Sequence, residues 1–170
     1  MSIVRPAVGP RRSGTEPPPL PEAVEARRER RLAGGLGLLG LAVFVVAAIL
    51  NPYDDAGRPR THGTHRQLGL PPCTLKSLTG LGCPSCGMTT AFSLLAHGDP
   101  AAAWRINWAG CVAALLAATG TTWFLLVAAG LPPGRFTSDE VVKFMVAIGT
   151  AVAVARWLAV LCGGGLSAAV

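Results

Sequence analysis

The chain has 170 residues, of which 51% are hydrophobic and only 14% carry a charged side chain. Ordinary globular domains contain about 25% charged residues, so this composition excludes a soluble protein that hides its apolar residues beneath a charged shell. The net charge of +6 does not indicate a nucleic-acid partner, because an arginine cluster directly before an apolar run supplies much of the excess and no recognition motif accompanies it.

The N-terminal segment, residues 1–26, is rich in Pro, Gly, Arg and Glu and contains no aromatic residue. We expect a disordered cytoplasmic tail, since this segment could not bury enough surface to offset the entropy of ordering. Residues 32–50 form an uncharged apolar run that reaches about 28 Å as a helix, close to the thickness of the hydrocarbon core. The length of the run and the lack of a small-x-small cleavage site disfavour a signal peptide. The run predicts a first membrane-spanning helix that ends at Asn51-Pro52.

Two further apolar runs follow, residues 107–130 without any charge and residues 141–162 with Lys143 and Arg156. We expect Arg156 to snorkel toward the headgroups, as Lys and Arg near the ends of membrane helices commonly do. Residues 27–170 are therefore predicted to be a single all-α membrane domain. Its parts are the spans 32–50, 107–130 and 141–162, with an extramembrane loop and a short helix over residues 51–106.

Basic residues predict the orientation, because they collect on the cytoplasmic side of membrane helices. Arginines within residues 27–31 precede the first span, and Arg135 and Lys143 flank the third. This predicts a multi-pass protein of the bacterial inner membrane with a cytoplasmic N-terminus and a periplasmic or extracellular C-terminus. The central loop carries the opposing signal of Arg58, Arg60 and Arg66.

Residues 77–96 are uncharged, but several residues within them argue against a continuous span: Gly80, Gly82, Pro84 and Gly87. A short helix is predicted to begin near Pro84, since proline is favoured at the first helical position, and Cys83 would directly precede it. Gly98 is expected to close this helix, and Asp99-Pro100 to open the next one as cap and first residue.

At 100° per residue, this short helix has a polar stripe and an apolar face on its opposite side. The stripe consists of Cys86, Thr90, Ser93 and His97, and the apolar face of Met88, Ala91, Phe92 and Leu95. We expect a helix that lies in the membrane interface or against the other helices with its apolar face buried. A re-entrant half-helix is the alternative.

The most specific segment is Cys83-Pro84-Ser85-Cys86-Gly87, followed by Thr89, by Gly98-Asp99 and by Asn107. It resembles a family of bacterial membrane proteins known as domain of unknown function 2752, whose pattern is Cys-Pro-x-Cys-Gly-x-Thr, a short helix, Gly-Asp and Asn-Pro. The resemblance covers roughly residues 51–130 and departs from the pattern at Thr90 and Trp108, where many members have Arg and Pro. It implies the membrane architecture and supplies no reaction.

Cys73, Cys83 and Cys86 admit three interpretations. Two of them could form a structural disulfide in an oxidising compartment. Cys83 and Cys86 could be a redox pair, with the Cys83 thiolate stabilised by a helix N-terminus. All three could bind zinc together with His62 or His65 of an H-x-x-H segment.

The sequence thus predicts first a structural or accessory membrane protein with an outward-facing cysteine motif. The expected partners are the lipid bilayer and other membrane proteins or a second copy of the chain, and no nucleic acid. Small residues in the spans would permit close helix packing: Gly34, Gly37, Gly110, Ala114, Ala118 and Gly120. The alternatives are a thiol–disulfide oxidoreductase that uses Cys83 and Cys86, and a metal-binding membrane protein. No cofactor is predicted, apart from zinc in the last case.

Overall fold

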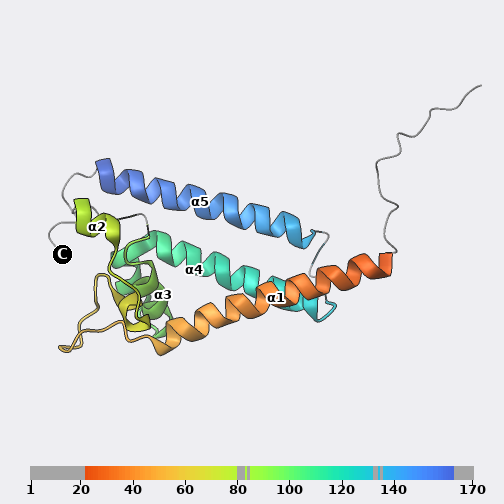
Figure 1. The fold of residues 1–170 in the computed structure, drawn as a ribbon, viewed down its shortest axis with the longest axis horizontal. Helices are drawn as coiled ribbons and strands as arrows, with labels where there is room; N and C mark the ends of the chain where they lie inside the picture. The colour runs from red at the N-terminus through yellow and green to blue at the C-terminus, as the bar shows by residue number, and fades with distance from the viewer. Residues whose placement is uncertain (1–21, 80–82, 84, 132–133, 135, 163–170) are drawn as a thin grey trace, which may run out of the picture.

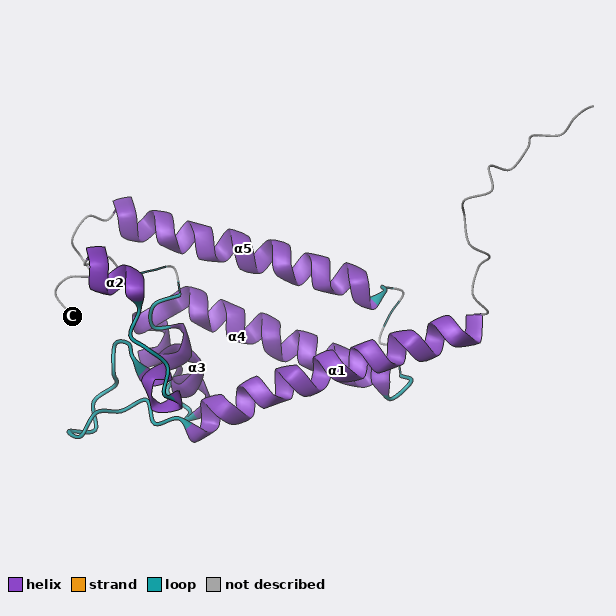
Figure 2. Ribbon diagram, in the orientation of Figure 1, coloured by secondary structure: helices purple, strands orange, loops and turns teal. Residues whose placement is uncertain are grey.

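The computed structural model describes residues 22–79, 83, 85–131, 134 and 136–162. The helices are α1 (Glu22–Ile49), the 3-10 helix η1 (Thr64–Leu68), α2 (Thr74–Thr79), α3 (Met88–Ala96), α4 (Pro100–Ala128) and α5 (Ser138–Cys162). The described ranges contain no β-strand, only an isolated antiparallel bridge between Tyr53 and Pro59 (Figure 2). The predicted all-α class is confirmed.

Three helices are long and apolar enough to cross a membrane: Ala23–Ile49, Pro100–Ala128 and Ser138–Cys162. They run in alternating directions (Figure 1), so the connection from α4 to α5 lies at the end of the bundle where α1 begins. The segment that contains α2 and α3 lies at the opposite end. The expectation of about three helices long and apolar enough to span a membrane is thereby confirmed.

The first helix starts earlier than the sequence suggested. Residues 22–26, expected to belong to the disordered tail, are the first residues of α1, and residues 1–21 lie outside the described part of the chain. The segment Glu22–Arg31 is rich in Ala, Glu and Arg, which are strong helix formers. A helix already formed in the apolar run extends through such residues without a new nucleation step. The expectation failed because it treated this segment as an isolated chain.

Small residues bring α1 and α4 close together. A Cβ atom added to Gly37 would lie 2.7 Å from Cδ2 of Leu125, and one added to Gly34 would lie 3.6 Å from Cβ of Ala128. At Gly40, the added atom would overlap the Oγ1 atom of Thr121. Gly37 and Gly40 therefore set the distance between these two helices, as the sequence predicted for Gly37, whereas a Cβ atom at Gly34 would make only an ordinary contact.

The short helix α3 begins at Met88 rather than near Pro84, which lies outside the described residues. The residues before it form successive turns, in which the Cys86 amide donates to the Cys83 carbonyl and the Met88 amide to the Ser85 carbonyl, both at 3.0 Å. Gly87 then adopts a left-handed conformation with φ +79°, which interrupts any helix that starts earlier. Cys83 is thus not at the N-terminus of α3, and the expected helix-dipole stabilisation of its thiolate is wrong.

The orientation of α3 also corrects the expectation. The buried residues are Thr90, Ala91, Ser93 and Leu94, whereas Met88, Phe92 and Leu95 are only half-buried. Ser93 Oγ donates to the Leu50 carbonyl at 2.5 Å, and Thr90 Oγ1 pairs with Thr64 Oγ1 at 2.8 Å. The Leu50 carbonyl follows the end of α1, where helix carbonyls lack intrahelical partners. Thr90 and Ser93 of the polar stripe face inward because their hydroxyls satisfy other buried polar groups, whereas His97 of the same stripe is exposed.

The start of α4 follows the sequence prediction. Gly98 has a φ of +78°, the Asp99 side chain accepts a hydrogen bond from the Ala102 amide at 3.0 Å, and Pro100 occupies the first turn. The helix is then interrupted at Asn107, which has a non-helical φ of −153° and ψ of 90°. Asn107 Oδ1 accepts from the Gly110 amide at 2.9 Å and so caps the second part of α4. The predicted beginning of the second span at Asn107 coincides with this kink.

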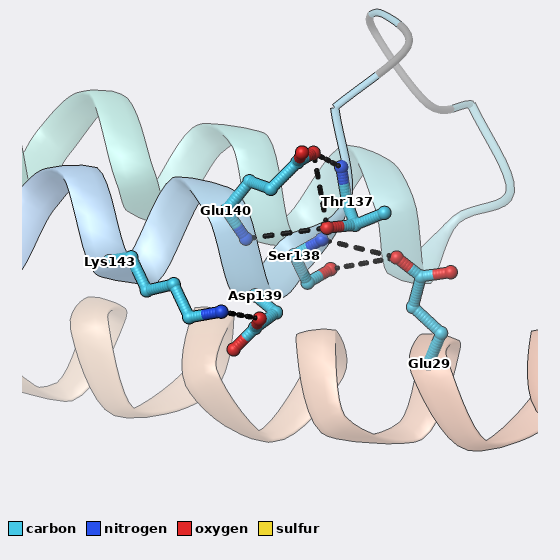
Figure 3. Close-up of polar contacts among 6 residues, drawn as sticks. All are labelled: Glu29, Thr137, Ser138, Asp139, Glu140 and Lys143. Atoms are coloured by element: carbon cyan, nitrogen blue, oxygen red, sulfur yellow. Dashed lines mark hydrogen bonds and ion pairs between the residues drawn. The ribbon is translucent and has the colours of Figure 1, made fainter.

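The third long helix, α5, has no buried residue and packs mainly on α4. Its N-terminus is capped by a reciprocal pair, in which Glu140 Oε2 accepts from the Thr137 amide at 2.8 Å and the Glu140 amide donates to Thr137 Oγ1 at 3.3 Å. Figure 3 shows that Ser138 also reaches α1, where its amide and its hydroxyl each donate to Glu29 at 3.2 Å.

Candidate metal centre

The sulfur atoms of Cys73, Cys83 and Cys86 lie within 4.8 Å of one another. All three residues are half-buried, and none of the five cysteines of the chain forms a disulfide in this structure. The Sγ atoms of Cys83 and Cys86 are 3.3 Å apart, and Cys83 Sγ is also 3.3 Å from Ser85 Oγ. The three cysteines that the sequence singled out therefore meet at one point.

Two backbone segments position these sulfurs. Cys73 directly precedes α2, and its carbonyl accepts hydrogen bonds from the amide and the hydroxyl of Ser77, both at 3.0 Å. Cys83 and Cys86 occupy the turn before α3. The short helix α2 and this turn thus present their cysteines to each other at the end of the bundle (Figure 1).

Asn107 fixes the second segment to the membrane helices. Its side chain is fully buried, and Nδ2 donates to the Cys86 carbonyl at 3.1 Å while Oδ1 caps α4. Gly87 permits this close approach, since a Cβ atom there would lie 3.0 Å from the Thr61 carbonyl oxygen and 3.1 Å from Ile106 Cγ2. The kink in α4 and the cysteine turn are therefore one structural unit.

A cavity of about 970 Å³ extends over the cysteines. Apolar as well as basic and polar side chains line it, and its described lining includes no Asp or Glu; the residues besides the three cysteines include Arg60, His62, His65, Arg66, Leu70, Ser77, Met88 and Thr89. His62 Nδ1 contacts Thr61 Oγ1 at 2.8 Å, and His65 Nε2 contacts the Pro71 carbonyl at 3.2 Å. Among the described residues, neither histidine belongs to the group of ligand atoms within 4.8 Å, although both line the same cavity.

The environment of Cys86 disfavours its thiolate in the absence of a metal. Burial, followed by the hydrogen bond with the Cys83 thiol, raises the pKa of Cys86 to about 12. The ordinary pKa of a cysteine is near 8.5, so the Cys86 thiol is protonated at neutral pH. A metal ion bound here would have to displace this proton, which is the usual coupling between thiolate ligands and pH.

The sequence did not predict the position of Arg156. Its Nη2 atom donates to the Ile106 carbonyl at 3.4 Å, so the guanidinium turns inward against α4 rather than outward to the headgroups. In a regular helix this carbonyl would accept from the Gly110 amide, but that amide donates to Asn107 Oδ1. The kink thus leaves a carbonyl for Arg156. The sequence predicted the start of a span at Asn107 but not this break within α4.

The other motif residues have structural roles: Gly98 and Asp99 form the junction of α3 and α4, and Thr89 lines the cavity. No curated protein and no solved structure matches the chain. A family model does match, over a segment that begins at Cys73 and ends within α4. The segment of residues 73–121 matches the family described as Protein of unknown function (DUF2752), which confirms the family that the sequence motif suggested.

Proposed function

We propose that this protein is an accessory membrane protein that binds a thiophilic metal ion through Cys73, Cys83 and Cys86, with zinc as the first candidate. The supporting observation is the convergence of three sulfur atoms within 4.8 Å. A structural disulfide or a redox pair needs two sulfurs and leaves the third without a role. A metal ion uses all three.

The dimensions of the group are compatible with such an ion. Zn–S bonds of about 2.3 Å in a tetrahedral site separate the sulfurs by about 3.8 Å, and the observed separations are 3.3 Å for Cys83 and Cys86 and at most 4.8 Å for any pair. Small side-chain rotations therefore suffice. Three ligands leave one position toward the cavity, where water, His62 or His65 could complete the coordination. An open position is typical of zinc sites that act on a ligand rather than of closed structural sites.

Thiol–disulfide exchange is the second candidate, favoured by the 3.3 Å contact between the sulfurs of Cys83 and Cys86. In this reaction the Cys83 thiolate attacks a partner's disulfide and displaces one partner sulfur as a thiolate. Cys86 then attacks the mixed disulfide, which releases the second partner thiol and leaves a Cys83–Cys86 disulfide. The partner is reduced by two electrons, and the cysteine pair is oxidised by two.

We further propose a cytoplasmic N-terminus and a cysteine cluster on the periplasmic side. The arginines within residues 27–31 lie in α1 at the end of the bundle that also holds the α4–α5 connection. Arg30 contacts this region, since a Cβ atom at Gly130 would lie 2.9 Å from its Nη2 atom. Such a basic end is typical of the cytoplasmic side.

One purified sample can distinguish the candidates, if its thiols are titrated before and after reduction and its metal content is measured. A stoichiometric metal that is lost in Cys73→Ala, Cys83→Ala and Cys86→Ala but retained in Cys162→Ala supports the metal centre. Thiols that appear only after reduction, together with a mixed disulfide trapped by Cys86→Ser, support exchange. A protein that takes up neither zinc nor cadmium and whose Cys86→Ser variant traps no mixed disulfide would contradict both proposals.

A further inference from the structure

Arg156 lies in a part of α5 that is otherwise uncharged, residues 144–162. Its guanidinium is turned toward α4, and its Nε atom is buried without a hydrogen-bond partner in the described part of the chain. Because α5 has no buried residue, tight packing does not explain why this long side chain turns inward.

A charge in a membrane span is costly unless an opposite charge compensates it. The Ile106 carbonyl satisfies one donor of Arg156, but it cannot neutralise the positive charge. The ion pairs among the described residues are Arg58–Asp54 and Lys143–Asp139, and neither involves Arg156. The guanidinium therefore needs a different source of negative charge.

The cysteine cluster becomes such a source when a bound metal ion displaces the protons of its thiols. Ile106, which accepts from Arg156, directly precedes Asn107, which donates to the Cys86 carbonyl at 3.1 Å. Gly87, the residue after Cys86, also lies against Ile106, since a Cβ atom at Gly87 would lie 3.1 Å from Ile106 Cγ2. The cation on this part of α4, Arg105, is exposed and donates to the Ala101 carbonyl at 3.3 Å. Arg156 thus contacts α4 directly beside the residues that hold the cysteine turn.

We propose that Arg156 is the counter-charge of the Cys73–Cys83–Cys86 centre and compensates the negative charge that three thiolates retain after a metal ion binds. This inference rests on the proposed metal binding. Three thiolates with a divalent ion have a net charge of −1, which one arginine neutralises. With a monovalent ion the net charge is −2, so the attraction to Arg156 is twice as large. Arg156 is a positioning residue and not a metal ligand.

The difference in net charge between a site with a divalent ion and one with a monovalent ion gives a test. If Arg156 acted only by packing, its replacement would weaken the binding of both ions equally. Cd²⁺ and Ag⁺ are titrated into the reduced full-length protein in detergent, in a background in which alanine replaces Cys111 and Cys162. The variants are Arg156→Gln, Arg156→Lys and, as a matched control on a nearby exposed arginine, Arg105→Gln.

We expect Arg156→Gln to weaken Cd²⁺ binding about tenfold and Ag⁺ binding about a hundredfold, since doubling the net charge of the site doubles the binding free energy that is lost. Arg156→Lys should restore most of both affinities, and Arg105→Gln should change neither by more than about twofold, because exposed charges are screened.

The outcomes separate this inference from the proposed function. If the starting protein binds neither ion, the metal centre itself is refuted, and the counter-charge with it. If it binds both ions and Arg156→Gln binds them equally well, only the role of Arg156 is refuted. Equal losses for Cd²⁺ and Ag⁺ that lysine does not restore would show a structural role for the side chain, and would also refute the counter-charge.

Discussion

Asn107 connects a long helix of the bundle to the cysteine turn. It is fully buried, it caps the second part of α4 through Gly110, and it holds the cysteine turn through the Cys86 carbonyl. A regular helix at this position would satisfy the Gly110 amide with the Ile106 carbonyl and leave both Cys86 and Arg156 without their partners on α4. The side chain therefore couples the geometry of a membrane helix to that of the candidate metal centre.

Replacing Asn107 with Ala should lower the free energy of unfolding by about 1–3 kcal/mol, because a buried amide and a buried carbonyl lose their partners. Thermal unfolding in detergent measures this loss, and metal affinity should fall with it because the cysteine turn is released. Thr119→Ala is the matched control, since the exposed Thr119 hydroxyl donates only to the Leu115 carbonyl of its own helix. Similar stabilities of the two variants would contradict the proposed role of Asn107.

The raised pKa of Cys86 predicts unequal thiol reactivity. Because the pKa of Cys86 is about 12 in the folded protein, its thiol stays protonated at pH 8, and iodoacetamide should modify Cys86 last among the three clustered cysteines. Peptide mass spectrometry after short exposure of the metal-free protein measures the order, and the denatured protein serves as the control in which this order disappears.

The raised pKa of Cys86 also destabilises the fold in alkali. Because the folded state holds the thiol proton more tightly than the unfolded state, the free energy of unfolding falls as the pH rises from about 9 toward 12.

At the scale of the helices, glycine and hydroxyl residues determine how the helices pack. Gly40 faces Thr121 on α4, whereas a Cβ atom at Gly35 would meet nothing within 4 Å. Gly40→Leu should therefore destabilise the protein by about 1–3 kcal/mol through overpacking, and Gly35→Leu should be tolerated. The yield and melting temperature of the monodisperse protein in detergent give the comparison. Equal behaviour of the two variants would show that α1 and α4 do not approach each other through this face.

Asp substitutions at a buried and at an exposed position of α3 give a second comparison. Ser93 is fully buried and donates to the Leu50 carbonyl, whereas Ala96 is exposed on the same helix. Ser93→Asp should lower the folded yield strongly, since a buried carboxylate beside a carbonyl oxygen has no donor. Ala96→Asp should fold nearly as well as the unmodified protein. The opposite ranking would restore the orientation expected from the sequence pattern.

The positions of the helices could be predicted largely from single residues and from apolar runs of the sequence. Which side of each helix is buried could not be predicted in this way. Gly98 and Asp99 have local chemistry that favours a turn and a cap, so their roles follow from the sequence, whereas Asn107 was predicted as the start of a span and not as a break. The burial of Thr90 and Ser93 depends on Thr64 and on the carbonyl of Leu50, which are distant in the chain. Gly87 set the start of α3, and nothing in the sequence distinguished its left-handed conformation from a position inside a helix. Arg156 turned inward because of a carbonyl freed on another helix.

At the scale of the whole molecule, the arginines within residues 27–31 and the cysteine cluster lie at opposite ends of the bundle, although Arg60 and Arg66 also line the cavity over the cysteines (Figure 1). In the proposed orientation, the three spans separate the cluster from the compartment that contains the N-terminus. The compartment that contains the cluster determines the redox environment of its thiols, since disulfides persist in the periplasm and not in the cytosol.

We expect a reporter fused after Asp99 to be periplasmic and a reporter fused near Arg135 to be cytoplasmic, as the basic flank of the first span predicts. Alkaline phosphatase and green fluorescent protein, which are active on opposite sides of the bacterial inner membrane, measure the two positions. A cytoplasmic Asp99 fusion would contradict the orientation and would favour reduced thiols and a bound metal over a disulfide.

The attachment of α5 has a mechanical consequence. The polar contacts of α5 with the rest of the protein lie near its two ends, Ser138 with Glu29 and Arg156 with the Ile106 carbonyl, and between them Met145 packs against Gly120 of α4. An α-helix is stiff about its axis, so a rotation at one end is also a rotation at the other. A displacement of Arg156 that turned α5 would therefore also shift Met145 against Gly120 and Ser138 relative to Glu29.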